Sequence, residues 1–157
     1  MTEVYLWLTA FIITLLFVAF FAGIETAFIS ANRLGIELKK KQGKASGIIM
    51  SRFMEEPSRF LGTCLIGFNI FLVIYGLLYS ELIKTSIWNR FSVESEYLKL
   101  TLDTLLSTII VLIFGEFLPK AIFRAKSDSL LGFFAQLSSF FHDLFHPIAS
   151  VFVNFSG

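Results

Sequence analysis

Long apolar stretches and shorter polar segments alternate along this chain. The apolar stretches cover about residues 4–24, 60–80 and 100–119. Each is close to the roughly 20 residues that an α-helix needs to cross a hydrocarbon core about 30 Å thick. The first two carry no charged residue, whereas the third contains Asp103 and Glu116. The pattern predicts an all-α integral membrane protein with three transmembrane helices in a single transmembrane domain over 1–157.

The polar segments carry a second, amphipathic pattern. Within residues 33–59, Ile48, Ile49, Phe53 and Met54 are spaced for a short helix on the membrane surface. From 128 to 155, apolar residues recur at steps of three and four: Leu130, Phe134, Leu137, Phe141, Leu144, Ile148 and Phe152. We therefore expect juxtamembrane amphipathic helices beside the three spans. The segment 128–155 could lie on the membrane, follow the bundle as a belt, or form a fourth span.

Composition supports a membrane protein and excludes several other classes. Hydrophobic residues make up 55% of the chain and charged residues 16%, against about 45–50% and roughly 25% in soluble domains. The net charge of +1 gives no reason to expect nucleic acid as a partner. Cys64 is the single cysteine, so one chain offers neither a disulfide nor a thiolate metal site.

The basic residues predict the orientation. Most of the Lys and Arg residues lie in 33–59 and 120–126, and few lie in the loop 81–99, which contains Lys84, Arg90 and Lys99. Positive charge favours the cytoplasmic side. We expect the N-terminus outside the cell (inner) membrane and the C-terminal helix in the cytoplasm.

The third apolar stretch contains the first candidate site. Glu116 lies where the span should still be in hydrocarbon, and an ionisable residue there indicates function. Pro119 cannot donate to the carbonyl of Gly115, which becomes available to a cation such as Mg²⁺. The alternative is a helix end, at which Glu116 pairs with Lys120 one turn later.

The other two stretches add polar groups at comparable depth. Glu25 follows the first stretch, and Asn69 with the helix-weakening Gly67 interrupts the second. With the predicted topology, oxygen atoms of Glu25, Asn69 and Glu116 could converge on one pocket that holds a dehydrated divalent ion. Alternatively, Glu25 is an interfacial residue and Asn69 a polar contact between helices.

Other arrangements give weaker hypotheses. His142, Asp143 and His146 have a spacing that suits a metal ion, and also one that suits the wet face of a helix. The sequence lacks a Ser/His/Asp set, a Cys/His pair at membrane depth and an H-E-x-x-H motif. An enzyme is therefore not expected.

Three segments carry a family resemblance: FAGIETAFISANRL, PSRFLGTCLIGFN and IFGEFLPK, in that order. Together they resemble the transmembrane domain of the CNNM/CorC family of magnesium transporters. The resemblance implies three spans with a juxtamembrane helix, a homodimer in membrane lipid, and Na⁺-dependent export of Mg²⁺ through an intramembrane site. It also implies cytosolic CBS domains after the membrane part, and no CBS-like sequence is found in this chain.

The resemblance also implies ligands for the ion. On the matching positions these are Glu25 and Ser30 in the first segment, Gly67 and Asn69 in the second, and Gly115 and Glu116 in the third. Two positions depart from the family pattern. Ala22 stands where many members have Ser, so a backbone carbonyl would replace a hydroxyl, and Phe68 stands where many have the first of two Asn. The rival hypothesis is a dimeric membrane anchor that positions cytosolic modules.

Overall fold

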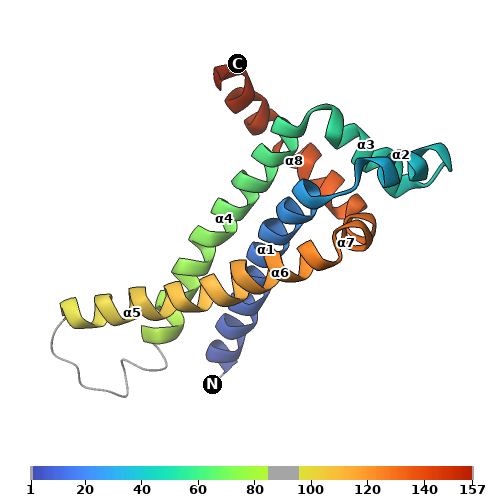
Figure 1. Ribbon diagram of the computed structural model, residues 1–157. Helices are drawn as coiled ribbons and strands as arrows, with labels where there is room; N and C mark the ends of the chain where they lie inside the picture. The colour runs from blue at the N-terminus through green and yellow to red at the C-terminus, as the bar shows by residue number, and fades with distance from the viewer. Residues whose placement is uncertain (1, 85–95, 157) are drawn as a thin grey trace.

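The computed structural model describes residues 2–84 and 96–156. All the regular secondary structure in these residues is helical. Three helices are long and apolar enough to cross a membrane (Figure 1). They are α1 (Thr2–Ser30), α4 (Pro57–Ile83), and a continuous third helix built of α5 (Glu96–Ile110), η2 (Val111–Phe117) and α6 (Leu118–Ala125). The predicted all-α membrane fold with three spans is confirmed. Arg90, which contributed to the predicted orientation, lies outside the described residues.

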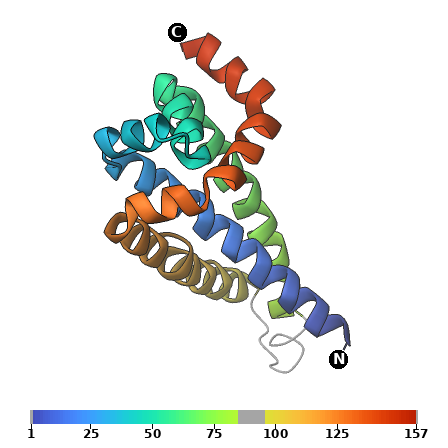
Figure 2. The same cartoon turned by 90° about the vertical axis from the view of Figure 1, so that its right-hand side faces the viewer.

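The first span is the centre of the bundle. Helix α1 packs against α4 on one side and against η2 and α6 on another (Figures 1 and 2). The third helix crosses α1 obliquely, so that α5 diverges from α1 while α6 stays close to it (Figure 1). Residues of α1 therefore meet both other spans, and a site shared by the three spans must form around this helix.

Four shorter or amphipathic helices gather at the end of the bundle where α1 ends: α2 (Arg33–Lys41), α3 (Ala45–Glu55), α7 (Ser127–Phe133) and α8 (Ala135–Ser156) (Figure 1). Helix α2 begins at an N-cap, because the Asn32 side-chain oxygen accepts the N–H of Leu34 at 3.0 Å. The predicted surface helix corresponds to α3, which packs against α2. These elements confirm the expected juxtamembrane helices.

The segment predicted as one helix over 128–155 is two helices that meet at Phe134. The backbone turns there because the Phe134 ring packs between the other helices. It stacks on Phe123 of α6, with ring centroids 5.8 Å apart, and meets the edge of Phe20 of α1 at 5.3 Å. A straight helix could not make both contacts and also lay α8 along α4.

Helix α8 follows the bundle and is not among the three candidate spans of the described residues. Its Phe141 lies 4.8 Å from the ring of Phe21 in α1 and 6.5 Å from that of Phe71 in α4. Phe145 continues the contact one turn later and is 8% exposed. Of the three placements considered for this segment, the contacts match the belt along the bundle.

Candidate functional site

The third span changes its winding at the predicted site. Residues Val111–Phe117 form a π-helix, in which the N–H of Leu118 donates to the carbonyl of Ile113, five residues earlier. Pro119 follows at the start of α6 and has no N–H to give to the carbonyl of Gly115. Short π segments inside α-helices frequently occur at functional sites. Here the segment contains both Gly115 and Glu116.

Gly115 allows the π segment to pack closely on α1. A Cβ atom at this buried position would lie 3.0 Å from Cγ2 of Val111 and 3.1 Å from Cγ1 of Val18. Gly67 of α4 is more restricted, because a Cβ there would overlap the ring of Phe21 on α1. The two glycines proposed as carbonyl ligands are therefore also points of close approach between α1 and its neighbours, as is Gly23 of α1 beside Phe123.

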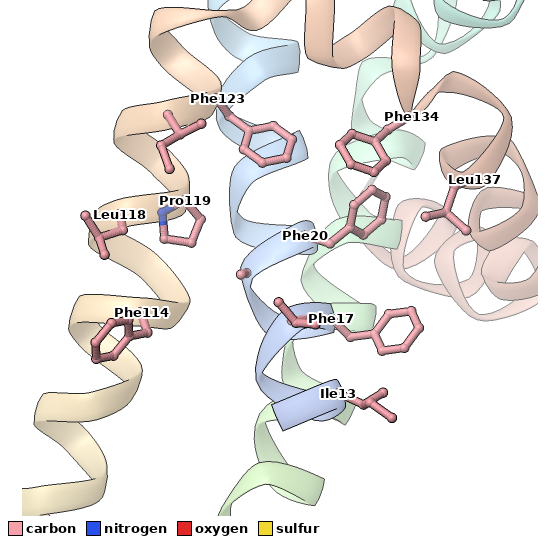
Figure 3. A pocket seen from close by; sticks show the side chains of 12 residues that line it. Ile13, Phe17, Phe20, Phe114, Leu118, Pro119, Phe123, Phe134 and Leu137 are labelled. Atoms are coloured by element: carbon pink, nitrogen blue, oxygen red, sulfur yellow. The ribbon is translucent and has the colours of Figure 1, made fainter. Parts of the chain in front are cut away.

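One line of residues on the third helix faces α1. Apolar residues lie on one side of this line, and charged residues lie on the other. Gly115, Pro119 and Phe123 recur every four residues, and all three are buried or partly buried at this contact. Figure 3 shows Pro119 and Phe123 on the side of the third helix that faces α1, with Phe114 and Leu118 beside them. By their register, Glu116 and Lys120 lie on the opposite flank of this line.

Glu25 lies between the other two spans. Glu25 is partly buried, and Lys120 of α6 is the opposite charge nearest to it in effect, although the two side chains form no ion pair within the described residues. Lys120 and Glu116 form no ion pair, although both lie in the described part of the chain. The helix-end pair considered from the sequence is thus not formed, and Lys120 is partly buried. Glu116 stays partly buried without a salt bridge among the described residues.

The carbonyl of Ala22, the expected replacement for a hydroxyl ligand, is already engaged. Ala22 is 1% exposed, and its oxygen accepts a hydrogen bond from Thr26 Oγ1 at 3.0 Å. The Thr26 hydroxyl therefore stands one turn from Ala22, next to Glu25 in sequence. The sequence analysis did not include the Thr26 hydroxyl among the candidate cation ligands, although Thr26 follows Ala22 by four residues, which is about one helical turn.

Asn69 and Ser30 lie on exposed surfaces of the single chain. The Asn69 Nδ2 donates to the carbonyl of Leu65 in its own helix at 2.7 Å. Because successive helical residues are turned by roughly 100°, Asn69 lies on the far side of α4 from the contact of Gly67. The structure thus gathers Ala22, Glu25 and Gly115 where α1 meets its neighbours, and leaves the Asn69 side chain away from that contact.

The histidines of α8 connect helices. Nε2 of His146 is hydrogen-bonded to Nη1 of Arg59 in α4 at 3.0 Å, and Nε of Arg59 also lies 3.2 Å from the carboxylate of Glu56. His142 packs on the ring of Phe53 in α3, with centroids 4.8 Å apart. Across residues 2–84 and 96–156, no three His, Cys, Asp or Glu side chains form a metal-binding group. A cation site among these spans would therefore also need hydroxyl, amide, carbonyl or water oxygens.

Comparison with known proteins adds the family. The family described as the cyclin M transmembrane N-terminal domain (CNNM) matches residues 9–157. The chain is similar to UPF0053 protein MG146 of Mycoplasma genitalium, with 30% identity over 155 residues, covering 93% of this chain and 35% of that protein. It is also similar to the UPF0053 inner membrane protein YfjD of Escherichia coli, with 28% identity over 104 residues, covering 66% of this chain and 22% of that protein. The chain therefore spans about a third or less of these relatives.

Proposed function

The chain belongs to the cyclin M transmembrane N-terminal domain family, and from this premise we propose that it carries Mg²⁺ across the membrane in exchange for Na⁺. The family is one of membrane transporter domains, and the finer assignment of ion and direction is our proposal. One observation supports it most: the π-helical interruption of the third span, which packs Gly115 against α1 and places Glu116 on the adjoining flank together with Lys120.

The ion chemistry suits these groups. Mg²⁺ takes about six oxygens at roughly 2.0–2.1 Å and gives up its water reluctantly. We assign the main negative charge to Glu116 and a carbonyl to Gly115, which Pro119 leaves without its α-helical donor. Glu25 supplies the second negative charge needed to balance a divalent ion. Lys120 neutralises Glu25 while the ion is absent, so Mg²⁺ competes with Lys120 as it enters.

The remaining ligands follow from the contacts around Ala22. Because the Ala22 carbonyl accepts from Thr26, we propose that the Thr26 hydroxyl takes the place of the Ser found in many relatives. Asn69 keeps an amide oxygen on the exposed face of α4, and it reaches the ion through a shift of α4 or from a second copy. Gly67 and Ser30 stay in the proposed ligand set through the resemblance alone.

The transport cycle uses the close helix contacts. Small residues at helix contacts allow neighbouring spans to approach and slide past one another. We propose that the pocket loads Mg²⁺ from the cytoplasm and opens outward when α1 moves against α4 and α6. We further propose a homodimer in the inner membrane, with the N-terminus outside and cytosolic CBS domains following the C-terminal helix in the full-length protein.

Flux through vesicles tests this function. The purified chain is reconstituted around a fluorescent Mg²⁺ indicator, and Mg²⁺ movement is followed with and without a Na⁺ gradient. Glu116→Gln should abolish the flux and also the rise in melting temperature that Mg²⁺ produces. Glu96→Gln is the matched control, because it neutralises an exposed acid at the other end of the same span. Equal flux in wild type and Glu116→Gln would contradict the assignment.

A dimeric membrane anchor is the second candidate. The exposed position of Asn69 favours it, as does the lack of any group of three His, Cys, Asp or Glu side chains placed for a metal among the described residues. An anchor predicts no thermal shift on titration with Mg²⁺ and full tolerance of Asn69→Leu. A transporter predicts a shift that saturates with Mg²⁺.

A further inference from the structure

A hollow of about 490 Å³ lies on the other flank of the same helix contact (Figure 3). Its walls come from α1, from η2 and α6, and from Phe134 and Leu137 at the junction of α7 and α8. All the side chains that line it are apolar. On the α1 wall, Leu16 and Phe20 are turned by the helix register well away from Glu25.

The hollow opens to the surface of two spans. Leu16 on its α1 wall is 64% exposed, and Phe114 and Ile122 on the opposite wall are 53% and 55% exposed. A water molecule needs two to four polar partners to be stable in a cavity, and this lining offers none. Inside a bilayer, the surrounding hydrocarbon is the matching occupant.

A lysine side chain, that of Lys126, lies beyond one end of the hollow. Phe114, Leu118, Ile122 and Lys126 follow one another every four residues, so they form a line along the third helix. The third helix ends at Ala125, and the N–H of Lys126 donates to the carbonyl of Ile122 at 3.1 Å, so Lys126 stands at the end of this line. Lys126 is exposed and forms no ion pair within the described part of the chain.

The length of this line fits one leaflet. Twelve residues separate Phe114 from Lys126, which at about 1.5 Å per residue is roughly 18 Å along the helix. Half of a hydrocarbon core is about 15 Å thick. An apolar line of this length with a lysine at the polar end has the shape of a phospholipid, because lysine stems lie along apolar surface and carry their charge to the headgroups.

We propose that this hollow binds one acyl chain of an anionic phospholipid, with Lys126 at its phosphate. Charge favours a lipid over a second copy of this chain. The same end of the bundle carries Arg124, Lys126 and the basic residues of α2, so a second copy seated in this hollow in the same orientation would place its basic end beside Lys126, and the proposed homodimer uses another face. The acyl chain touches Pro119 and Phe123, and through them it sets the spacing of α1 and α6 from the flank opposite the ion site.

Native mass spectrometry of the intact chain tests the proposal. The protein is incubated with vesicles of palmitoyl-oleoyl phosphatidylglycerol or of the corresponding phosphatidylcholine, extracted in mild detergent, and examined for retained lipid. Phosphatidylglycerol should be retained about fivefold more, the factor that one lysine near an anionic surface supplies. Lys126→Gln should remove this preference, and Lys41→Gln, at the exposed end of α2, should keep it.

A second pair of variants tests the hollow itself. Ala19→Phe places a ring inside it and should reduce retention of both lipids to background, whereas Ala121→Phe, on an exposed part of α6 outside the hollow, should not. If circular dichroism shows that Ala19→Phe has lost helicity, the variant Leu118→Trp, which fills the hollow from its rim, is used in its place. Unchanged retention in the filled variant, or equal retention of the two lipids by wild type, would overturn the proposal.

The oligomeric state, read from the mass of the intact assembly in the same spectra, distinguishes a lipid in the hollow from a second copy of the chain. If Ala19→Phe dissociates an oligomer and leaves lipid retention unchanged, a second copy occupies the hollow and the lipid proposal fails. The thermal shift caused by Mg²⁺ is measured on the same samples. Because the ion site lies on the other flank, failure of the lipid proposal leaves that shift in place, and failure of the ion site leaves lipid retention in place.

Discussion

The two flanks of the contact between α1 and the third helix differ in chemistry and in packing. One flank carries Glu25, Glu116 and Lys120, and the helices there approach closely at Gly115. The other is an open, wholly apolar hollow. The comparison shows a division of labour along one helix contact: the charged groups gather, partly buried, on one side of the close approach at Gly115, and the looser side is left to hydrocarbon. Two of the four predictions below test these flanks directly, and the other two set them against the α1–α4 contact and against a group outside the spans, from the largest expected effect to the smallest.

The largest effect is expected from a side chain at the contact between α1 and α4. Gly67→Val places a methyl-bearing carbon where the ring of Phe21, 1% exposed, already lies. Overpacking of this kind costs about 1–3 kcal/mol. Gly76→Val in the same helix is the control, since no atom lies within 4 Å of its added Cβ. Thermal unfolding in detergent should separate the two variants, and equal melting temperatures would show that the contact is not close.

The second prediction concerns the partner of Lys120. In a double-mutant cycle, Glu25→Gln and Lys120→Met should show a coupling free energy of about 1 kcal/mol, since Lys120 is the opposite charge that acts on the partly buried Glu25 across the helix contact. The cycle of Glu116→Gln with Lys120→Met should show less coupling, because the π segment ends between these two residues and changes the spacing that an α-helical pair needs. The reverse result would restore the helix-end pair inferred as an alternative from the sequence.

A smaller effect is expected on the apolar flank. Ile122→Ala widens the hollow at a position that is 55% exposed. Surface substitutions of this kind usually change the free energy of unfolding by less than about 0.5 kcal/mol. The melting temperature should therefore hardly change. A loss as large as that of Gly67→Val would mean that this flank is packed by protein.

The smallest effect is a pH dependence outside the spans. Burial lowers the pKa of His142 in α8 below its ordinary value of 6.5, and Asp143 beside it opposes the shift. The unfolded chain then binds a proton more readily than the folded one, so stability should fall as pH decreases from about 6.5 toward the lower folded pKa. His142→Gln should remove this slope in melting temperature between pH 7.5 and 5, and His146→Gln should keep it. An unchanged slope in His142→Gln would assign the effect to another group.

The spans could be predicted from the sequence because their signal is local. Twenty apolar residues in a row have few alternatives, and each predicted stretch lies within one long helix. The division of the last segment at Phe134 could not be predicted, because it depends on contacts with Phe20 and Phe123, which are distant in sequence. Periodicity continues across the break and conceals it.

The candidate site was predictable in its residue types and less so in its geometry. Glu25 and Glu116 stand out as acids in apolar surroundings. The sequence suggested Lys120 as the partner of Glu116 because four residues separate them in an α-helix, but the π segment ends between them and Lys120 acts on Glu25. Thr26 could not be identified from the sequence, because its hydrogen bond to the Ala22 carbonyl and the burial of Ala22 are visible only in the structure.

The winding of Val111–Phe117 makes the effect of a single-codon deletion depend on where it falls. A π turn accommodates one more residue than the α turn it replaces. Deleting one residue from this segment would therefore let an ordinary α-helix run through the span, and the residues beyond it would keep nearly the same faces. Deleting one residue from the α-helical stretch after it, before Lys126, has no extra residue to absorb it and would rotate Lys126 by roughly 100° away from its apolar line. Two in-frame deletions of equal length and hydropathy would thus differ in whether the two flanks keep their register.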